Sequence, residues 1–191
     1  MNNNVKQSEI VNRKLLGSRL ISSAISWEDL LKNACLASHF FPNNPNYMGS
    51  AICCVELTII ELSLKAVLAM EGYNEIQLKD KSMSHNLAPI YEAVSEEVKS
   101  EIERICGYNR ERILFELHGI DNNCNGLVNW RYLDFIDNLS SPSTKQHFCD
   151  TFVKRFTFSC CRAAEKKCNI KRTSITNIAN PIQKGKGNIN G

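Results

Sequence analysis

The sequence contains no convincing stretch in which polar and apolar residues alternate, which is the pattern of a half-buried β-strand. Apolar residues recur instead three and four positions apart, the spacing of an amphipathic helix. We therefore predict an all-α protein, an irregular bundle of about six helices. Its 191 residues suit one domain. We place this domain at residues 9–167, between a disordered segment over residues 1–8 and a disordered basic tail over residues 168–191.

The chain also lacks a long apolar run without charges. Its most apolar segment, residues 51–71, contains Glu56, Glu61 and Lys65, and an acid or lysine near the bilayer centre costs about 2.5–3.5 kcal/mol. The first residues are polar and lack the apolar run of a secretory signal. These absences predict a cytoplasmic protein that does not enter a membrane.

No pair of cysteines has the Cys-x-x-Cys spacing of a zinc site. The nine cysteines include two adjacent pairs, Cys53-Cys54 and Cys160-Cys161, and in a reducing compartment we expect them to be small buried residues. Nor does the chain offer a cluster of carboxylates that would hold Mg²⁺. The sequence thus predicts neither a metal site nor a cofactor.

The segment from Asp121 to Gly126 looks like the first half of an EF-hand calcium loop, with Asn123 and Asn125 at alternate positions. The twelfth position of such a loop must supply a bidentate carboxylate, but this chain has Tyr132 there. Calcium binding is therefore the least favoured interpretation of the segment. The alternative is a simple Asn/Gly turn.

The end of the chain carries charge of one sign. No acid follows Glu165, whereas six basic residues do: Lys166, Lys167, Lys171, Arg172, Lys184 and Lys186. Two interpretations stay open. A polar tail of this composition can be solvated and disordered, or it can be a basic arm that holds RNA or DNA phosphates.

The longest predicted helix covers residues 47–71. It carries two adjacent apolar stripes, so it should pack on more than one side and be the most buried helix. Glu61 and Lys65 lie four residues apart in the favourable order for an intrahelical ion pair, and Gly72 is placed to end the helix. We expect His85, at the start of the next helix, to bond to backbone or to Glu61; a catalytic role is the less favoured alternative.

Other patterns predict a helix over residues 9–23 and a second one from Ser26 onward, with Ser26 as the cap and Glu28 in the first turn. A polar loop is predicted over residues 73–84. Further helices are predicted near residues 86–94, over residues 95–119 with an interruption at Gly107, and over residues 127–139. Gly119 is placed to end one of them. Phe148, Phe152 and Phe156 recur every four residues on a last helix. We expect this aromatic stripe to exceed what one bundle buries, which favours a homodimer.

Three short motifs carry a resemblance: Glu61-Leu-Ser-Leu-Lys65, His85-Asn-Leu87 and Trp130-Arg131-Tyr132. Together they resemble the HEPN family, the higher-eukaryote and prokaryote nucleotide-binding domain, over residues 28–165. The resemblance implies an α-helical and often dimeric domain. Such domains are common in bacterial toxin–antitoxin and anti-phage systems, and many are metal-independent ribonucleases. It therefore implies RNA, a second copy of the chain and an antitoxin as partners.

The active form of this family carries an arginine, four to six residues and then a histidine. Arg112 and His118 match that spacing. A histidine can move a proton at the 2′-hydroxyl or the leaving oxygen, and an arginine can hold the scissile phosphate. Two departures favour the alternative, two ordinary surface residues. The position after Arg112 is apolar Ile113 instead of polar, and on an unbroken helix six steps place the side chains about 120° apart. They could then converge only at a helix end, which Gly119 would supply, or across a dimer.

Arg131 also has two interpretations. Between Trp130 and Tyr132 it could bind phosphate in a groove, or it could stack and pair with a buried acid such as Glu61. Three functions therefore compete: an RNA-cleaving or RNA-binding domain, a non-catalytic module that dimerises, and a calcium-responsive protein.

Overall fold

The computed structural model describes residues 3–38, 45–124 and 150–172. These residues form seven helices and no strand, which confirms the all-α prediction. The helices are α1 (Asn3–Ser38), α2 (Pro45–Met70), α3 (Glu75–Leu78), α4 (Leu87–Ala93), α5 (Glu96–Cys106), α6 (Arg110–Cys124) and α8 (Asp150–Lys167). Among the described residues, no helix is long and apolar enough to cross a membrane. The predicted helix over residues 127–139 lies outside the described residues.

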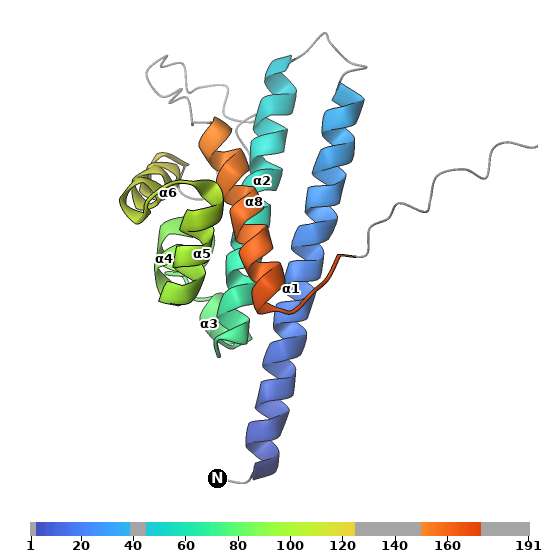
Figure 1. Ribbon diagram of the computed structural model, residues 1–191, viewed down its shortest axis with the longest axis vertical. Coiled ribbons are helices and arrows are strands. Elements are labelled where there is room, and N and C mark those ends of the chain that lie inside the picture. Colours follow the sequence, from blue (N-terminus) through green and yellow to red (C-terminus); the bar gives the residue numbers. More distant parts are fainter. Residues whose placement is uncertain (1–2, 39–44, 125–149, 173–191) are drawn as a thin grey trace, which may run out of the picture.

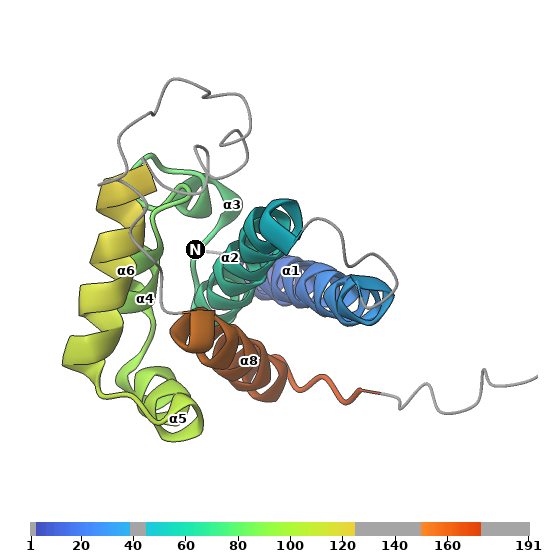
Figure 2. The same ribbon diagram turned by 90° about the horizontal axis from the view of Figure 1, so that it is seen from above.

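Helix α2 is the centre of the bundle. It packs against α1 and α8 on its two long sides and against α4 (Figures 1 and 2). From Glu56 to Ala69, only Thr58 and Leu62 are more than marginally exposed, and Ile59 is fully buried. The prediction that this helix is the most buried is therefore correct, because both apolar stripes have a neighbouring helix to cover them.

Helix α1 is one continuous helix, so the prediction of two helices over this segment is wrong. It begins at Asn3, inside the segment expected to be disordered, and passes through Ser26 without a break. The Ser26 hydroxyl donates to the carbonyl of Ser22 at 3.0 Å instead of capping a new helix. The segment contains no proline, and its single glycine faces α2, so nothing in the sequence stops the helix.

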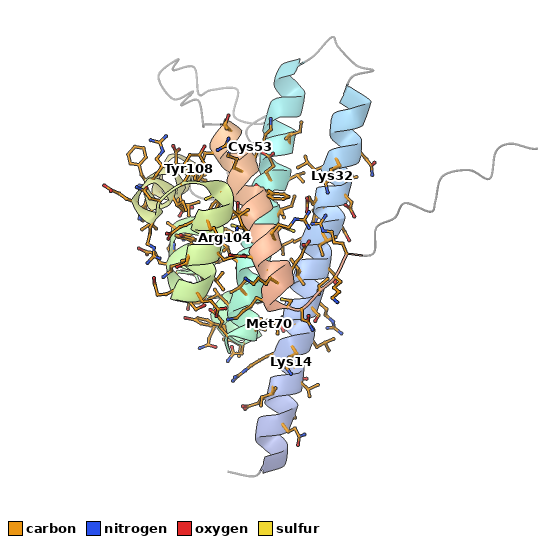
Figure 3. All side chains as sticks on the ribbon, viewed as in Figure 1. Lys14, Lys32, Cys53, Met70, Arg104 and Tyr108 are labelled. Atoms are coloured by element: carbon orange, nitrogen blue, oxygen red, sulfur yellow. The ribbon has the colours of Figure 1, made fainter. Side chains whose placement is uncertain are left out.

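That glycine, Gly17, allows α1 and α2 to approach closely. A Cβ atom at Gly17 would lie 3.0 Å from the sulfur of Met70 and 3.2 Å from the carbonyl of Ala66. Met70 lies at the lower end of α2 beside α1 (Figure 3). Further along α1, Ile21, Ala24 and Glu28 continue the same buried face.

The helix ends follow local chemistry. Gly72 has φ +114° and Tyr73 N–H donates to the Leu68 carbonyl at 3.0 Å, so α2 ends in a Schellman motif as its glycine predicted. The following segment, predicted as a loop, contains the single turn α3, which Asn74 and Gln77 close with a capping box. Gly107, at φ +74°, separates α5 from α6.

Two expectations concern the later helices, and the first of them is wrong. Helix α6 continues through Gly119 to Cys124, so Gly119 does not end it. Phe152 and Phe156 are buried inside the bundle, where their rings stack with centroids 5.3 Å apart. These two rings therefore leave no aromatic surface for a dimer, and Phe148 lies outside the described residues.

Candidate functional site

The outer face of α6 presents Arg112, Phe115 and His118, which are all exposed. The opposite face, formed by Ile113, Leu117 and Ile120, is buried against the bundle. At about 100° per residue, Arg112 and His118 lie about 60° to either side of Phe115. Phe115 is 68% exposed, which is unusual for so large an apolar side chain. We call Arg112, Phe115 and His118 the α6 triad.

The two predicted catalytic residues differ in their contacts. The Arg112 guanidinium forms an ion pair with Glu116, one turn along the helix, and lies 5.6 Å from the centre of the Phe115 ring. Its remaining N–H donors have no partner among the described residues. His118 is exposed and makes no hydrogen bond or ion pair with any described residue, although its charged form lies close enough to Asp121 to oppose the rise that burial causes in the pKa of that carboxyl.

Within one chain, Arg112 and His118 cannot share a phosphate. Six residues of unbroken helix separate them by about 9 Å along the axis and about 120° around it. Because α6 does not end at Gly119, the helix-end geometry expected from the sequence is absent. Of the two routes open to this pair, only convergence across two copies of the chain is left.

The predicted polar core on α2 is present. Lys65 Nζ donates to Glu61 Oε1 at 2.7 Å, and Glu61 Oε2 lies 3.2 Å from Nδ1 of His85. The side chains of Glu61 and Lys65 are only 8% and 11% exposed. This confirms the expectation that His85 bonds to Glu61. The other proposed partner, Arg131, lies outside the described residues.

This polar core holds the chain before α4 in place. His85 has φ +64°, a left-handed conformation that is uncommon for a residue with a side chain. The bond to Glu61 fixes that residue against α2 just before α4 begins. Both charged groups of the Glu61–Lys65 pair are buried and bonded to each other, and this geometry fits a structural role.

Asp121 has a role that the calcium interpretation did not anticipate. Its two carboxylate oxygens accept the backbone N–H groups of Leu87 and Ala88, at 2.9 and 2.8 Å. They thereby satisfy two free donors at the start of α4. Burial raises the pKa of Asp121, while these backbone bonds act in the opposite direction. The residue also lies within α6, so the predicted loop is helical up to Cys124. Tyr132 lies outside the described residues.

A fourth cluster joins α1 to the end of α8, and the sequence did not reveal it. It consists of Glu28, Cys161, Glu165 and Arg172, and we call it the α1–α8 cluster. The first three are almost fully buried, at 7%, 0% and 7% exposed. Their ligand atoms all lie within 4.8 Å of one another.

The end of α8 brings Arg172 into the cluster. Asn169 adopts φ +53°, and Ile170 N–H donates to the Glu165 carbonyl at 2.9 Å, the signature of a Schellman motif. The chain therefore turns back and crosses α1 (Figure 1). Arg172 Nε then donates to Glu165 at 2.5 Å, and Nη2 of Arg172 bonds to Glu28.

Electrostatics in the cluster are set by burial and by these bonds. Burial, together with the two neighbouring carboxylates, raises the pKa of the Cys161 thiol to about 12. Burial also raises the pKa of Glu28, but the hydrogen bonds from Arg172 and Lys32 outweigh it and leave this pKa below its ordinary value. These shifts favour the ionised form of Glu28 and the neutral thiol of Cys161.

Glu28 lies 133 residues before Cys161 in the sequence, which is why spacing could not reveal the cluster. Glu28 was interpreted as an acid in the first turn of a helix capped by Ser26, and Arg172 as one charge of a tail. One signal was present: Glu165 is the last acid of the chain, and it directly precedes the basic segment.

Comparisons with known proteins return no match to this chain, whether with protein-family models, with curated proteins or with solved structures. Function must therefore be inferred from the geometry and charge of the sites themselves.

Proposed function

We propose that this protein acts on RNA through the α6 triad, and that it cleaves RNA without a metal as a homodimer. In this proposal each catalytic site combines Arg112 of one copy with His118 of the other. The resemblance to the HEPN family supports this proposal, and it also suggests a toxin or anti-phage role with an antitoxin as partner.

One observation carries the proposal: the triad is symmetric about Phe115 and exposed. Arg112 and His118 lie three residues before and after Phe115, each about 4.5 Å away along the helix axis. If two α6 helices cross at an oblique angle about a two-fold axis at Phe115, Arg112 of each copy faces His118 of the other. Two-fold interfaces are self-complementary in this way. The same packing would cover both exposed Phe115 rings.

Chemistry at such a composite site needs no metal. A histidine can take a proton from the 2′-hydroxyl and return one to the leaving oxygen, because the ordinary pKa of imidazole lies near neutrality. An arginine can stabilise the charge that develops on the phosphate. The donors of Arg112 that Glu116 does not use are available for that contact.

The test is RNA cleavage in EDTA by the wild type and by His118→Ala, Arg112→Ala and a control, Arg104→Ala. Arg104 is an exposed arginine on α5 whose described partner is Glu101 (Figure 3). We expect wild type and control to cleave alike, and each triad variant to lose about 10²–10⁴ in rate. If both triad variants cleave RNA as the wild type does, the α6 triad is not the active site.

The second candidate is a non-catalytic module that dimerises through the same face. The exposure of Phe115 favours it as much as it favours the enzyme, because an exposed aromatic ring can serve binding alone. A folded dimer that neither cleaves nor binds RNA, and that Phe115→Ser converts to a monomer, would decide for this alternative.

A further inference from the structure

The α1–α8 cluster has the form of a site built for a cation. The carboxylate oxygens divide into two sets. Glu28 Oε2 and Glu165 Oε1 point inward toward Cys161 Sγ, at 3.3 and 3.7 Å from the sulfur. The guanidinium of Arg172 lies against all three atoms, with Nη2 3.3 Å from the sulfur.

The outward oxygens are held by other basic side chains. Lys32 Nζ lies 3.1 Å from Glu28 Oε1, and Arg162 Nη1 donates to Glu165 Oε2 at 2.6 Å. These two contacts orient both carboxylates while leaving their inner oxygens for a ligand. Supporting bonds of this kind are what fix metal-binding carboxylates in place.

We propose that Glu28, Cys161 and Glu165 form a binding site for a thiophilic divalent cation such as Zn²⁺, and that the guanidinium of Arg172 is the cation that fills this site in the present structure. The metal would enter by displacing Arg172 from the cluster. No sequence motif of closely spaced ligands predicts such a site, because Glu28 is far from Cys161 and Glu165 in the chain.

The two separations between the sulfur and the inner carboxylate oxygens fit zinc. With Zn–S near 2.3 Å and Zn–O near 2.1 Å, a tetrahedral site separates sulfur from oxygen by roughly 3.6 Å. The two separations in the cluster, 3.3 and 3.7 Å, bracket that distance. One thiolate and two carboxylates also leave a fourth position open, as in zinc sites that bind a water or a substrate. A thiolate ligand favours Zn²⁺ over Mg²⁺ or Ca²⁺.

Replacing the Arg172 guanidinium by the metal ion leaves the net charge of the cluster unchanged. When the metal binds, the Cys161 S–H bond breaks, its proton passes to solvent, and a metal–sulfur bond forms. The guanidinium of Arg172 leaves with its positive charge. One proton and one guanidinium depart as one divalent cation enters, so the net charge of the buried cluster is the same in both states. Lys32 and Arg162 can therefore keep their contacts with the carboxylates.

The experiment is a titration of the reduced 191-residue chain with Co²⁺, which reports a thiolate ligand by a sulfur-to-cobalt charge-transfer absorption, followed by competition with Zn²⁺. We expect this absorption in the wild type, its loss on adding Zn²⁺, and its loss in Cys161→Ser. The matched control is Cys160→Ser, which removes the neighbouring buried thiol and should keep the absorption.

Arg172→Ala sharpens the test. Removing the internal competitor should tighten Co²⁺ binding by about tenfold or more, because the binding-competent state no longer needs to be opened. Lys171→Ala, the exposed neighbour, should leave the affinity unchanged. Arg172→Gln serves as a second variant if the alanine form does not fold. The proposal is overturned if folded wild type and folded Arg172 variants show no thiolate absorption, or if Cys161→Ser retains it.

Discussion

Helices α2 and α6 each carry an acid and a base four residues apart, and the two pairs have different consequences. On α2, the side chains of Glu61 and Lys65 are buried and bonded to each other at 2.7 Å, and His85 bonds to Glu61 as well. On α6, Arg112 pairs with Glu116, but the Arg112 side chain is 52% exposed and stands beside an exposed aromatic ring. The same spacing thus produces a structural bond in one place and an accessible charge in the other.

The difference is one of burial. A buried ion pair that loses one partner leaves an uncompensated charge, so both residues are committed to the fold. An exposed pair contributes little to stability and can exchange its partner for a ligand such as a phosphate. On this comparison, substitutions on α2 should change stability, and substitutions in the α6 triad should change function alone.

Glu61→Ala should have the largest effect on stability. It leaves the Lys65 ammonium buried without a partner and removes the anchor of His85, so the free energy of unfolding should fall by about 3–5 kcal/mol. Urea denaturation measures the change. Glu61→Gln, which keeps the shape and one acceptor, should cost less. A loss below about 1 kcal/mol for Glu61→Ala would mean that the pair is not a structural bond.

Arg172→Ala should rank next, because it removes hydrogen bonds to two buried carboxylates and should cost about 2 kcal/mol at neutral pH. The cost depends on pH through Glu28, whose pKa lies below its ordinary 4.5 in the folded protein. Its stabilisation is complete above that ordinary pKa and is lost as the pH falls through the lower folded value.

The gap between wild type and Arg172→Ala should therefore narrow as the pH falls below about 4.5. Urea denaturation at neutral and acid pH checks this, with Lys171→Ala as the control, which should stay within about 0.5 kcal/mol of wild type. A gap that widens in acid would contradict the assigned role of Glu28.

Asp121→Ala should cost about 1 kcal/mol, the usual loss when a helix start loses its capping carboxylate. Because both oxygens of Asp121 already accept backbone N–H groups of α4, added calcium should leave the melting temperature of the wild type unchanged. A rise at sub-millimolar Ca²⁺ would show that the carboxylate is free to bind metal.

Phe115→Ser should have the smallest effect on stability, within about 0.5 kcal/mol of wild type, because the ring is largely exposed. If α6 forms the dimer contact, the same substitution should weaken the dimer strongly. Light scattering of wild type and Phe115→Ser over a range of concentrations measures this. If the wild type and Phe115→Ser dimerise equally, the dimer interface does not involve the α6 triad.

Much of the fold could be predicted from the sequence because it depends on local patterns. The double apolar stripe of residues 47–71 predicted the central helix, and Gly72 and Gly107 marked real breaks, since each has a positive φ. The predictions of a helix start at Ser26 and a helix end at Gly119 were wrong for a common reason. A serine or a glycine permits a helix end but does not impose one, and tertiary packing kept α1 and α6 continuous.

The candidate sites divide in the same way. The Glu61–Lys65 pair was predictable because both residues lie on one helix. The bond from Asp121 to the start of α4 and the α1–α8 cluster were not, because they join segments that only the folded chain brings together. For the α6 triad, sequence spacing identified Arg112 and His118, but only the structure showed that Phe115 between them is exposed.

The most direct test of the composite site is complementation between two inactive variants. Arg112→Ala and His118→Ala are each purified, shown to be folded and inactive on RNA, and then mixed in equal amounts and allowed to exchange subunits. A mixed dimer keeps one intact site, with its arginine and histidine both unaltered. Random exchange should therefore restore about a quarter of the wild-type activity. A mixture as inactive as its components, with exchange confirmed, would contradict the claim that the two copies share the site.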